Sequence, residues 1–179
     1  MFTDTPKEKK CDCLLHSDTI YPAGDTVLEA GCGVGSQTVI LAKNSPGARF
    51  TSIDISPTSL QAAATLVEQE KISNVTLRLA DIFDLPFAAA SFGHIFVCFV
   101  LEHLPRPVEA LLRLKSVLKP GGSITVIEGD HGSTYFYPES SLALRTIQCL
   151  VELQSRAGGN ALIGRQLYPL LRKAGFRQP

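Results

Sequence analysis

Short apolar runs alternate with longer amphipathic segments from residue 26 onward. The apolar runs have the length of β-strands, and they begin near residues 26, 49, 75, 95 and 123. Between them, apolar side chains recur at the three- and four-residue spacing of helices. Strands and helices that alternate in this way form right-handed βαβ units, whose parallel sheet carries helices on both faces. The pattern predicts an α/β fold built on a doubly wound sheet.

The apolar runs differ in the burial that they predict. Residues 95–100 are continuously apolar, which is typical of a central strand covered on both faces. Residues 75–79 alternate apolar and polar side chains, as an exposed or edge strand does. Ser56 followed by Pro57 predicts the start of a helix. The stripe expected to bury that helix consists of Leu60, Ala63, Ala64 and Val67.

Further helices are predicted at 36–43, 107–118, about 139–157 and 164–174, the last one ended by Gly175. Residues 1–18 are polar and unpatterned, and we expect a flexible lead-in there. Residues 19–179 are predicted to form a single domain, within which about 138–171 is interpreted as a helical insertion.

Composition narrows the classes of partner. The chain has 179 residues and a formal net charge of +0, which argues against a large binding surface for nucleic acid or an anionic membrane. No apolar run approaches the roughly 20 residues of a membrane span. Five cysteines with irregular spacing, two of them (Cys98 and Cys149) inside apparent core segments, favour a reducing cytoplasm.

One cluster near the start has metal-ligand character. Cys11, Cys13 and His16 lie close together in the sequence. A structural zinc site needs four ligands, and no fourth is evident nearby. We therefore expect no metal site.

The most chemically suggestive stretch is a glycine run after the first predicted strand. Gly31, Gly33 and Gly35 alternate with other residues and lead into the helix that starts at Ser36. Glycine permits positive φ and close approach of a ligand to the backbone. The helix start offers free N–H groups, which suit an anionic group. A strand, a glycine loop and a helix in this order predict a nucleotide-type site.

Acidic residues occur at the ends of the first three predicted strands. Glu29 precedes the glycine run, Asp54 follows the second strand, and Asp81 follows the third. Ligands of doubly wound sheets bind at the carboxyl ends of the strands, so these residues are expected to meet at one site. Asp54 is suited to both hydroxyls of a ribose, and Asp81 to the amino group of an adenine. The neighbours expected to flank the adenine ring are Ile55 and Ile82.

Together these motifs resemble the class I S-adenosylmethionine-dependent methyltransferases, particularly the small-molecule branch called type 11, which is similar to the ubiquinone-biosynthesis enzymes. The stretches that carry the resemblance are Val27–Gly35, Asp54–Ser56, Ala80–Asp81, Phe92–Leu104, Leu114–Gly122 and Ala174–Phe176. The resemblance implies S-adenosylmethionine as cofactor. It assigns the methionyl end of the cofactor to Glu29, Gly31, Cys32, Gly33, Gly35, Cys98 and Phe99.

The resemblance also implies a Rossmann-like three-layer sandwich with strand order 3-2-1-4-5. Family members usually add a sixth and a seventh strand, and no segment here is predicted to supply them. The fifth strand would then be an open edge, which favours pairing with a second copy of the chain.

Catalytic residues are less determined. Glu102 and His103 follow the fourth strand and His131 follows the fifth, so an acid–base group beside the methyl acceptor is one interpretation. Ordinary loop and helix-start residues at the rim of the pocket are the other. Methyl transfer from a sulfonium depends mainly on alignment, so a base is needed only for an acceptor that keeps a proton at neutral pH.

Two other functions compete with methyl transfer to a small organic acceptor. A nicotinamide dehydrogenase has a similar sheet, but its glycines are spaced G-x-G-x-x-G, whereas Ser36 stands where the last glycine would be. The second alternative is a cofactor-binding module or fragment without turnover, which the shortened sheet would suit.

Overall fold

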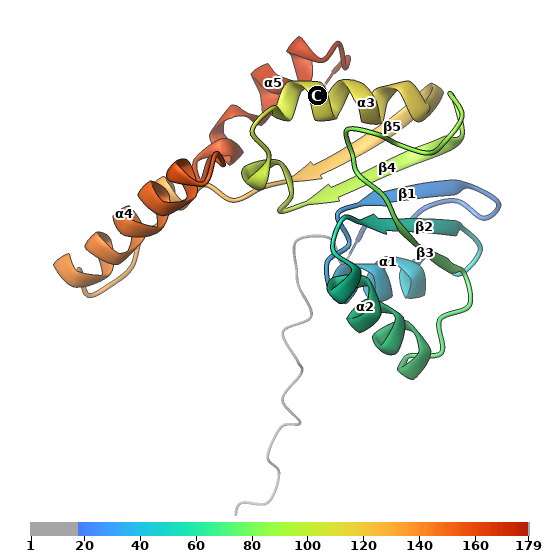
Figure 1. Cartoon of the computed structure of the whole chain (residues 1–179), viewed down its shortest axis with the longest axis horizontal. Helices are drawn as coiled ribbons and strands as arrows, with labels where there is room; N and C mark the ends of the chain where they lie inside the picture. The colour runs from blue at the N-terminus through green and yellow to red at the C-terminus, as the bar shows by residue number, and fades with distance from the viewer. Residues whose placement is uncertain (1–17, 179) are drawn as a thin grey trace, which may run out of the picture.

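The computed structural model describes residues 18–178, which form a single parallel sheet flanked by helices (Figure 1). The strands are β1 (Thr26–Ala30), β2 (Arg49–Asp54), β3 (Val75–Leu79), β4 (Phe92–Cys98) and β5 (Leu118–Ile127). Their order is β3-β2-β1-β4-β5, and every neighbouring pair is parallel. The α/β class and the strand order predicted from the sequence are confirmed.

The helices are α1 (Ser36–Asn44), α2 (Pro57–Gln69), α3 (Pro107–Val117), α4 (Ser141–Arg156) and α5 (Leu167–Lys173). Three short 3-10 helices are η1 (Leu101–His103), η2 (His131–Ser133) and η3 (Ile163–Gln166). Helices α1 and α2 cover one face of the sheet, and α3 and α5 cover the other (Figure 1). The sheet is therefore the middle layer of three.

Each face of the sheet has its own apolar core because side chains alternate along a strand. Leu28 and Ile95 point to the face under α3 and α5, where they pack with Leu111 and Leu114. Val27, Phe96 and Phe50 point to the other face and pack with Leu41, Ala42 and Tyr21. The central strands are buried from both sides in this way.

The strand predictions hold with shifted ends. β3 is an edge strand, as its alternating pattern predicts, and β4 lies inside the sheet. β4 ends at Cys98 rather than residue 100 because Phe99 has a φ of 55°, which turns the chain out of the strand. β5 begins at Leu118, earlier than predicted, and pairs there with Phe92 across an irregular register.

The predicted buried stripe of α2 is partly wrong. Only Ala63 is buried, whereas Leu60 and Val67 are half-buried and Ala64 is exposed. The reason is the position of α2, which packs mainly against the edge strand β3 and α1 rather than over the middle of the sheet. Its N-terminus is as predicted, since the Ser56 hydroxyl accepts a hydrogen bond from the Ser59 N–H at 3.2 Å.

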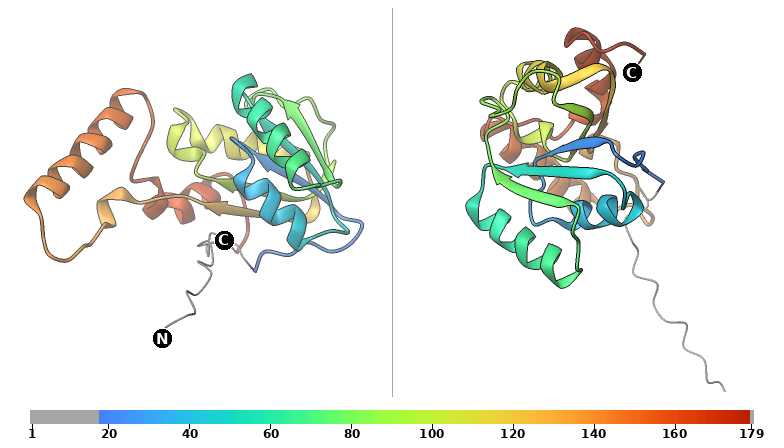
Figure 2. Two further views of the ribbon diagram at one scale, coloured as in Figure 1. Left: turned by 90° about the horizontal axis from the view of Figure 1, so that it is seen from below. Right: turned by 90° about the vertical axis from the view of Figure 1, so that its right-hand side faces the viewer.

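Helix α4 projects from the body of the molecule, as both figures show (Figures 1 and 2). None of its residues is buried, and Cys149 is exposed, which corrects the expectation that this cysteine lies in the core. No helix within residues 18–178 combines the length and apolar character needed to cross a membrane.

Candidate active site

The glycine loop links β1 to α1 with left-handed backbone at alternate positions. Gly31, Gly33 and Gly35 have φ values of 82°, 53° and 86°. A Cβ at Gly31 would overlap the Val100 side chain, and one at Gly35 would lie 3.0 Å from the Cβ of Ala63. Both conformation and close packing therefore require glycine at these two positions.

Glu29 lies beneath this loop rather than in the cavity above it. The Thr38 and Ser52 hydroxyls donate to its Oε2 atom at 2.7 and 2.6 Å. Burial raises the pKa of Glu29, because the charged form loses its water, while these two hydrogen bonds act in the opposite direction. Glu29 thus joins β1, β2 and α1 below the loop, and its direct contact with the cofactor stays a prediction.

Asp54 connects the second strand to the glycine loop. Its Oδ2 atom accepts a hydrogen bond from the Gly33 N–H at 2.9 Å, and Oδ1 accepts one from the Ser56 N–H at 2.8 Å. An ionised carboxylate has about four acceptor positions. Asp54 therefore keeps acceptor capacity for a pair of hydroxyl groups while it fixes the loop.

Asp81 occupies the equivalent place after β3. Its Oδ1 atom accepts a hydrogen bond from the Phe83 N–H at 2.8 Å. This bond fixes the turn that carries Ile82, which is buried, and Phe83, whereas Ile55 across the cavity is 69% exposed. An acidic group with apolar neighbours suits an aromatic base that carries an amino group.

These residues surround a cavity of about 520 Å³ at the carboxyl ends of the strands. Seven of the predicted cofactor residues line it: Gly31, Gly33, Asp54, Ile55, Asp81, Ile82 and Phe99. The four predicted residues outside its lining are Glu29, Cys32, Gly35 and Cys98. Lining residues that the sequence patterns did not single out include Phe83, Val100 and Leu104. Their position in the sequence could have indicated them, since each of the three comes shortly after the end of β3 or β4.

Cys32 lies in the loop with little access to solvent. Its side chain is buried, and burial together with the nearby carboxylates of Glu29 and Asp54 raises its pKa to about 12. A thiol in this state is a small apolar group rather than a nucleophile. Cys32 therefore contributes packing to the loop.

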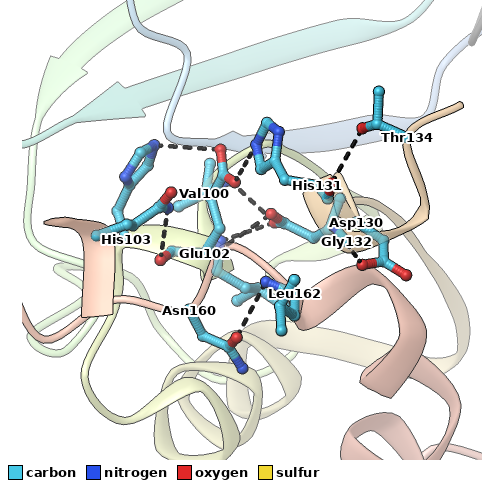
Figure 3. A network of polar contacts seen from close by, with 12 residues as sticks. Val100, Glu102, His103, Asp130, His131, Gly132, Thr134, Asn160 and Leu162 are labelled. Carbon is cyan, nitrogen blue, oxygen red and sulfur yellow. Dashed lines mark hydrogen bonds and ion pairs between the residues drawn. The ribbon is translucent and has the colours of Figure 1, made fainter. Parts of the chain in front are cut away.

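A second group of polar residues lies where β4 and β5 end (Figure 3). The Glu128 carboxylate accepts hydrogen bonds from the N–H groups of Val100, Leu101 and Glu102, at 2.9, 2.7 and 3.3 Å. It thereby holds η1 against the end of β5. Glu128 is not among the site residues predicted from the sequence. It could have been predicted in the same way as Asp54, because both are acidic residues at the carboxyl end of a strand.

The three catalytic candidates come together here. Figure 3 shows the Glu102 carboxylate between the rings of His103 and His131. The Nε2 atom of His103 lies 3.4 Å from Oε1, and that of His131 lies 3.7 Å from Oε2. His103 also lines the cavity of the glycine loop. The structure thus places these three residues beside the candidate cofactor cavity.

A second cavity, of about 370 Å³, lies under α4. Its walls are mostly apolar and consist of Leu144, Ile147, Val151 and Leu162, with His131, Gly132, Thr134, Gln148 and Glu152 supplying polar atoms. Arg165 donates two hydrogen bonds of 2.8 Å to Asp130, which lowers the pKa of that carboxyl. This pair fixes η2, and with it His131, against η3.

Comparison with known proteins identifies the family. The family model described as a methyltransferase domain matches residues 22–175. The chain belongs to this methyltransferase family. S-adenosylmethionine is the cofactor of the family, which confirms the cofactor predicted from the sequence.

Curated relatives agree with the family. The chain is 36% identical over 152 residues to an uncharacterized methyltransferase of Schizosaccharomyces pombe, covering 80% of this chain and 53% of that protein. It is 38% identical over 125 residues to a demethylmenaquinone methyltransferase of Tropheryma whipplei, covering 70% and 50%. This methyltransferase domain therefore spans about half the length of the relatives it matches.

Solved structures share the fold at low identity. A methyltransferase of Aquifex aeolicus superposes with a TM-score of 0.66 at 20% identity, covering 87% of this chain and 73% of that one. A Haemonchus contortus phosphoethanolamine N-methyltransferase in complex with S-adenosyl-L-methionine gives 0.69 at 22% identity, covering 88% and 34%. These likenesses confirm the Rossmann-like arrangement.

Within the part of the chain that the structure describes, no group of three or more histidine, cysteine or acidic side chains is placed to hold a metal ion. The cysteine–histidine cluster of Cys11, Cys13 and His16 lies outside the described residues.

Proposed function

We propose that this methyltransferase domain transfers the methyl group of S-adenosylmethionine to a small organic acceptor by in-line displacement. The observation that carries the proposal is the cavity at the carboxyl ends of the strands, which combines a glycine loop with Asp54 and Asp81. When bound, the cofactor supplies a methyl group on a sulfonium, which is a good leaving group. The protein then has to align the acceptor and exclude water.

Each part of the cavity has a role in this proposal. Asp54 accepts hydrogen bonds from the ribose hydroxyls, and Asp81 accepts one from the adenine amino group. Ile55 and Ile82 flank the adenine. The methionyl end lies along the glycine loop with Gly31, Gly33 and Phe99, while Glu29, Cys32, Gly35 and Cys98 support that part of the site from behind.

The cavity under α4 is proposed to hold the acceptor. Its lining residue His131 lies near Glu102, whose other carboxylate oxygen lies near His103 in the lining of the candidate cofactor cavity. Its walls suit an apolar molecule. Relatives named demethylmenaquinone methyltransferase and O-methyltransferase support an organic acceptor. The net charge of +0 gives no support to nucleic acid.

Calorimetry and a transfer assay test the proposal. S-adenosylmethionine and S-adenosylhomocysteine should bind the full chain, and NADH should not. Isotopic label from the methyl group should then appear in members of a panel of phenols, thiols and amines. Binding without any label transfer would favour the alternative of a cofactor-binding module, and absence of binding would contradict the proposal altogether.

Two further expectations belong to the same proposal. We infer a cytoplasmic location from the use of cysteine in the sequence. We also infer that β5, an edge strand of the sheet formed by residues 18–178, pairs with β5 of a second copy.

A further inference from the structure

Glu102 has a carboxylate that the fold does not satisfy. Its side chain is only 10% exposed, and Oε2 has no hydrogen-bond partner among residues 18–178. The backbone carbonyl of Glu102, by contrast, is satisfied, since it accepts hydrogen bonds from the Asn160 N–H at 2.7 Å and from Gln154 Nε2 at 3.1 Å. Burial of an unpaired acidic oxygen is costly. Such a group calls for a role beyond stability.

Two imidazoles flank this carboxylate, and each lines a different cavity. His103, near Oε1, lines the cavity of the glycine loop, whereas His131, near Oε2, lines the cavity under α4. Glu102 therefore lies between the proposed cofactor cavity and the proposed acceptor cavity. This is the region in which the methyl group has to pass from the cofactor to the acceptor.

Within residues 18–178, three charged or titratable groups face Glu102. They are His103 on η1, His131 on η2 and Glu128 at the end of β5. Glu128 is already engaged by three backbone N–H groups, and burial raises its pKa. Its role is thus to hold η1, which leaves Glu102 and His131 as the pair with unused capacity toward the second cavity.

We propose that Glu102 and His131 form a carboxylate–imidazole pair that takes the proton from a hydroxyl-bearing, apolar methyl acceptor in the cavity under α4. This inference rests on the proposed methyl transfer. Glu102 is the positioning residue, since its Oε2 faces the Nε2 atom of His131. The Nδ1 atom of His131 is then the ring nitrogen that is available to the acceptor.

The separation of 3.7 Å between Oε2 and Nε2 is longer than a hydrogen bond. Catalytic hydrogen bonds are often long before the substrate binds and tighten in the loaded complex. The side chain of His131 is 38% exposed, so its ring has room to move toward Glu102 and to exchange a proton with water.

The proton and electron balance is simple. The hydroxyl oxygen forms a bond to the methyl carbon as the carbon–sulfur bond breaks, and the bonding pair stays on sulfur. The hydroxyl proton passes to His131, and the negative charge of Glu102 stabilises the imidazolium until the proton leaves to solvent. The products are a methyl ether, the neutral thioether and one proton.

A hydroxyl is the acceptor group that needs such a pair most. A thiol of low pKa already loses its proton near neutral pH and gains little from a base. The apolar walls formed by Leu144, Ile147 and Val151 select a hydrocarbon body rather than a charged one. An aromatic alcohol meets both conditions, and 2-naphthol and 2-naphthalenethiol form a probe pair that differs only in the attacking atom.

The test compares Glu102→Gln and His131→Gln with the wild type on both probes. General-base catalysis contributes roughly 100-fold or more. Methylation of 2-naphthol should therefore fall by about that factor in each variant, while methylation of 2-naphthalenethiol changes less than about threefold. Glu68→Gln, on the exposed surface of α2, is the matched carboxylate control. An equal loss on both probes in Glu102→Gln and His131→Gln would show a merely structural role and overturn the inference.

A binding measurement tests the role of the Glu102–His131 pair without requiring methyl transfer. The chain loaded with S-adenosylhomocysteine should bind 2-naphthol about tenfold more tightly than 2-methoxynaphthalene, since only the former donates a hydrogen bond to the pair. Both variants should lose this preference. Absence of the preference in the wild type, or failure to bind 2-naphthol, would overturn the inference even if label transfer to another acceptor upholds the proposed function. Failure to bind S-adenosylmethionine would instead refute the proposed function itself.

Discussion

Asp54 shows how one side chain both builds a loop and faces a ligand site. Its two oxygens accept hydrogen bonds from the N–H groups of Gly33 and Ser56, and the carboxylate lines the cavity. The geometry of the glycine loop and the proposed ribose contact therefore depend on the same residue. The sequence motif predicts the second role but not the first.

Replacement of Asp54 should weaken cofactor binding directly, because the variant loses a carboxylate that lines the cavity. Hydrogen bonds to charged groups contribute about 1.5–3 kcal/mol, so Asp54→Ala should lower the affinity for S-adenosylhomocysteine by roughly 10- to 100-fold. Asp54→Asn keeps one acceptor oxygen and should fall between. Calorimetric titration measures both variants. Asp25→Ala is the control, because Asp25 pairs with His94 at the opposite end of the strands, 2.9 Å apart. Wild-type affinity in Asp54→Ala would contradict the assignment.

Glu29 should make stability depend on pH in a distinctive direction. Burial raises its pKa above the ordinary value of 4.5, so the folded chain retains a proton that the unfolded chain releases. The wild type should therefore lose stability relative to Glu29→Gln as the pH rises above that ordinary value and through the folded pKa. Urea unfolding across about pH 4 to pH 8 measures the difference. A gain of wild-type stability over that range would contradict the burial argument.

Some contacts of the site lie beyond what a sequence pattern can predict. Glu102, His103 and His131 were candidates because each follows a predicted strand. The approach of His131 to Glu102, however, depends on the Asp130–Arg165 pair, which joins two segments separated by helix α4. Local patterns predict which residues reach the edge of the sheet, whereas the fold decides which of them meet.

At the scale of secondary-structure elements, two helices with the same cap provide a matched test. The hydroxyls of Ser56 and Ser140 accept hydrogen bonds of 3.2 Å from the third residue of α2 and of α4. Helix α2 packs on α1 and β3, whereas α4 buries no residue. Ser56→Ala should therefore lower the global free energy of unfolding by about 1 kcal/mol.

Ser140→Ala should act locally instead. The loss of its cap should speed amide exchange within α4 while the global free energy of unfolding stays within about 0.3 kcal/mol of the wild type, because weakly packed elements open separately. Hydrogen exchange followed by mass spectrometry, together with urea unfolding, separates the two effects. Equal global losses in both variants would show that α4 unfolds together with the sheet.

The ends of elements were predicted less well than their existence. Residues 119–122 (Lys-Pro-Gly-Gly) look like a loop, yet the structure includes them in β5 with an irregular register toward β4. The paired positions pass from Leu118 opposite Phe92 to Ser123 opposite His94, so residues 119–122 bulge out of the register. Pro120 and the two glycines suit such an irregular segment and give no strand signal in the sequence. The strand core at 123–127 was predicted correctly because its pattern is apolar.

The geometry of the parallel sheet determines both the two apolar cores and the position of the cavities. Alternation along β1 and β4 sends side chains to both faces, so the layers on either side are fixed by the strands themselves. All strands point the same way, which brings Asp54, Phe99 and Glu128 to one edge from three different strand ends. The sequence therefore predicts the architecture and the position of the site together.

The inferred pairing of β5 predicts that self-association protects one edge of the sheet but not the other. β5 and β3 are the two edge strands formed by residues 18–178. Unpaired N–H and C=O groups at such an edge can bond to a second copy. As the concentration rises from about 5 to about 200 μM, sedimentation velocity should show dimers, and amide exchange should slow within β5 while β3 stays unchanged. A chain that remains monomeric, or one whose β3 is protected instead, would contradict the pairing. Because the same sample also reports on α4, slowed exchange there alone would point to an interface on that helix rather than on the sheet.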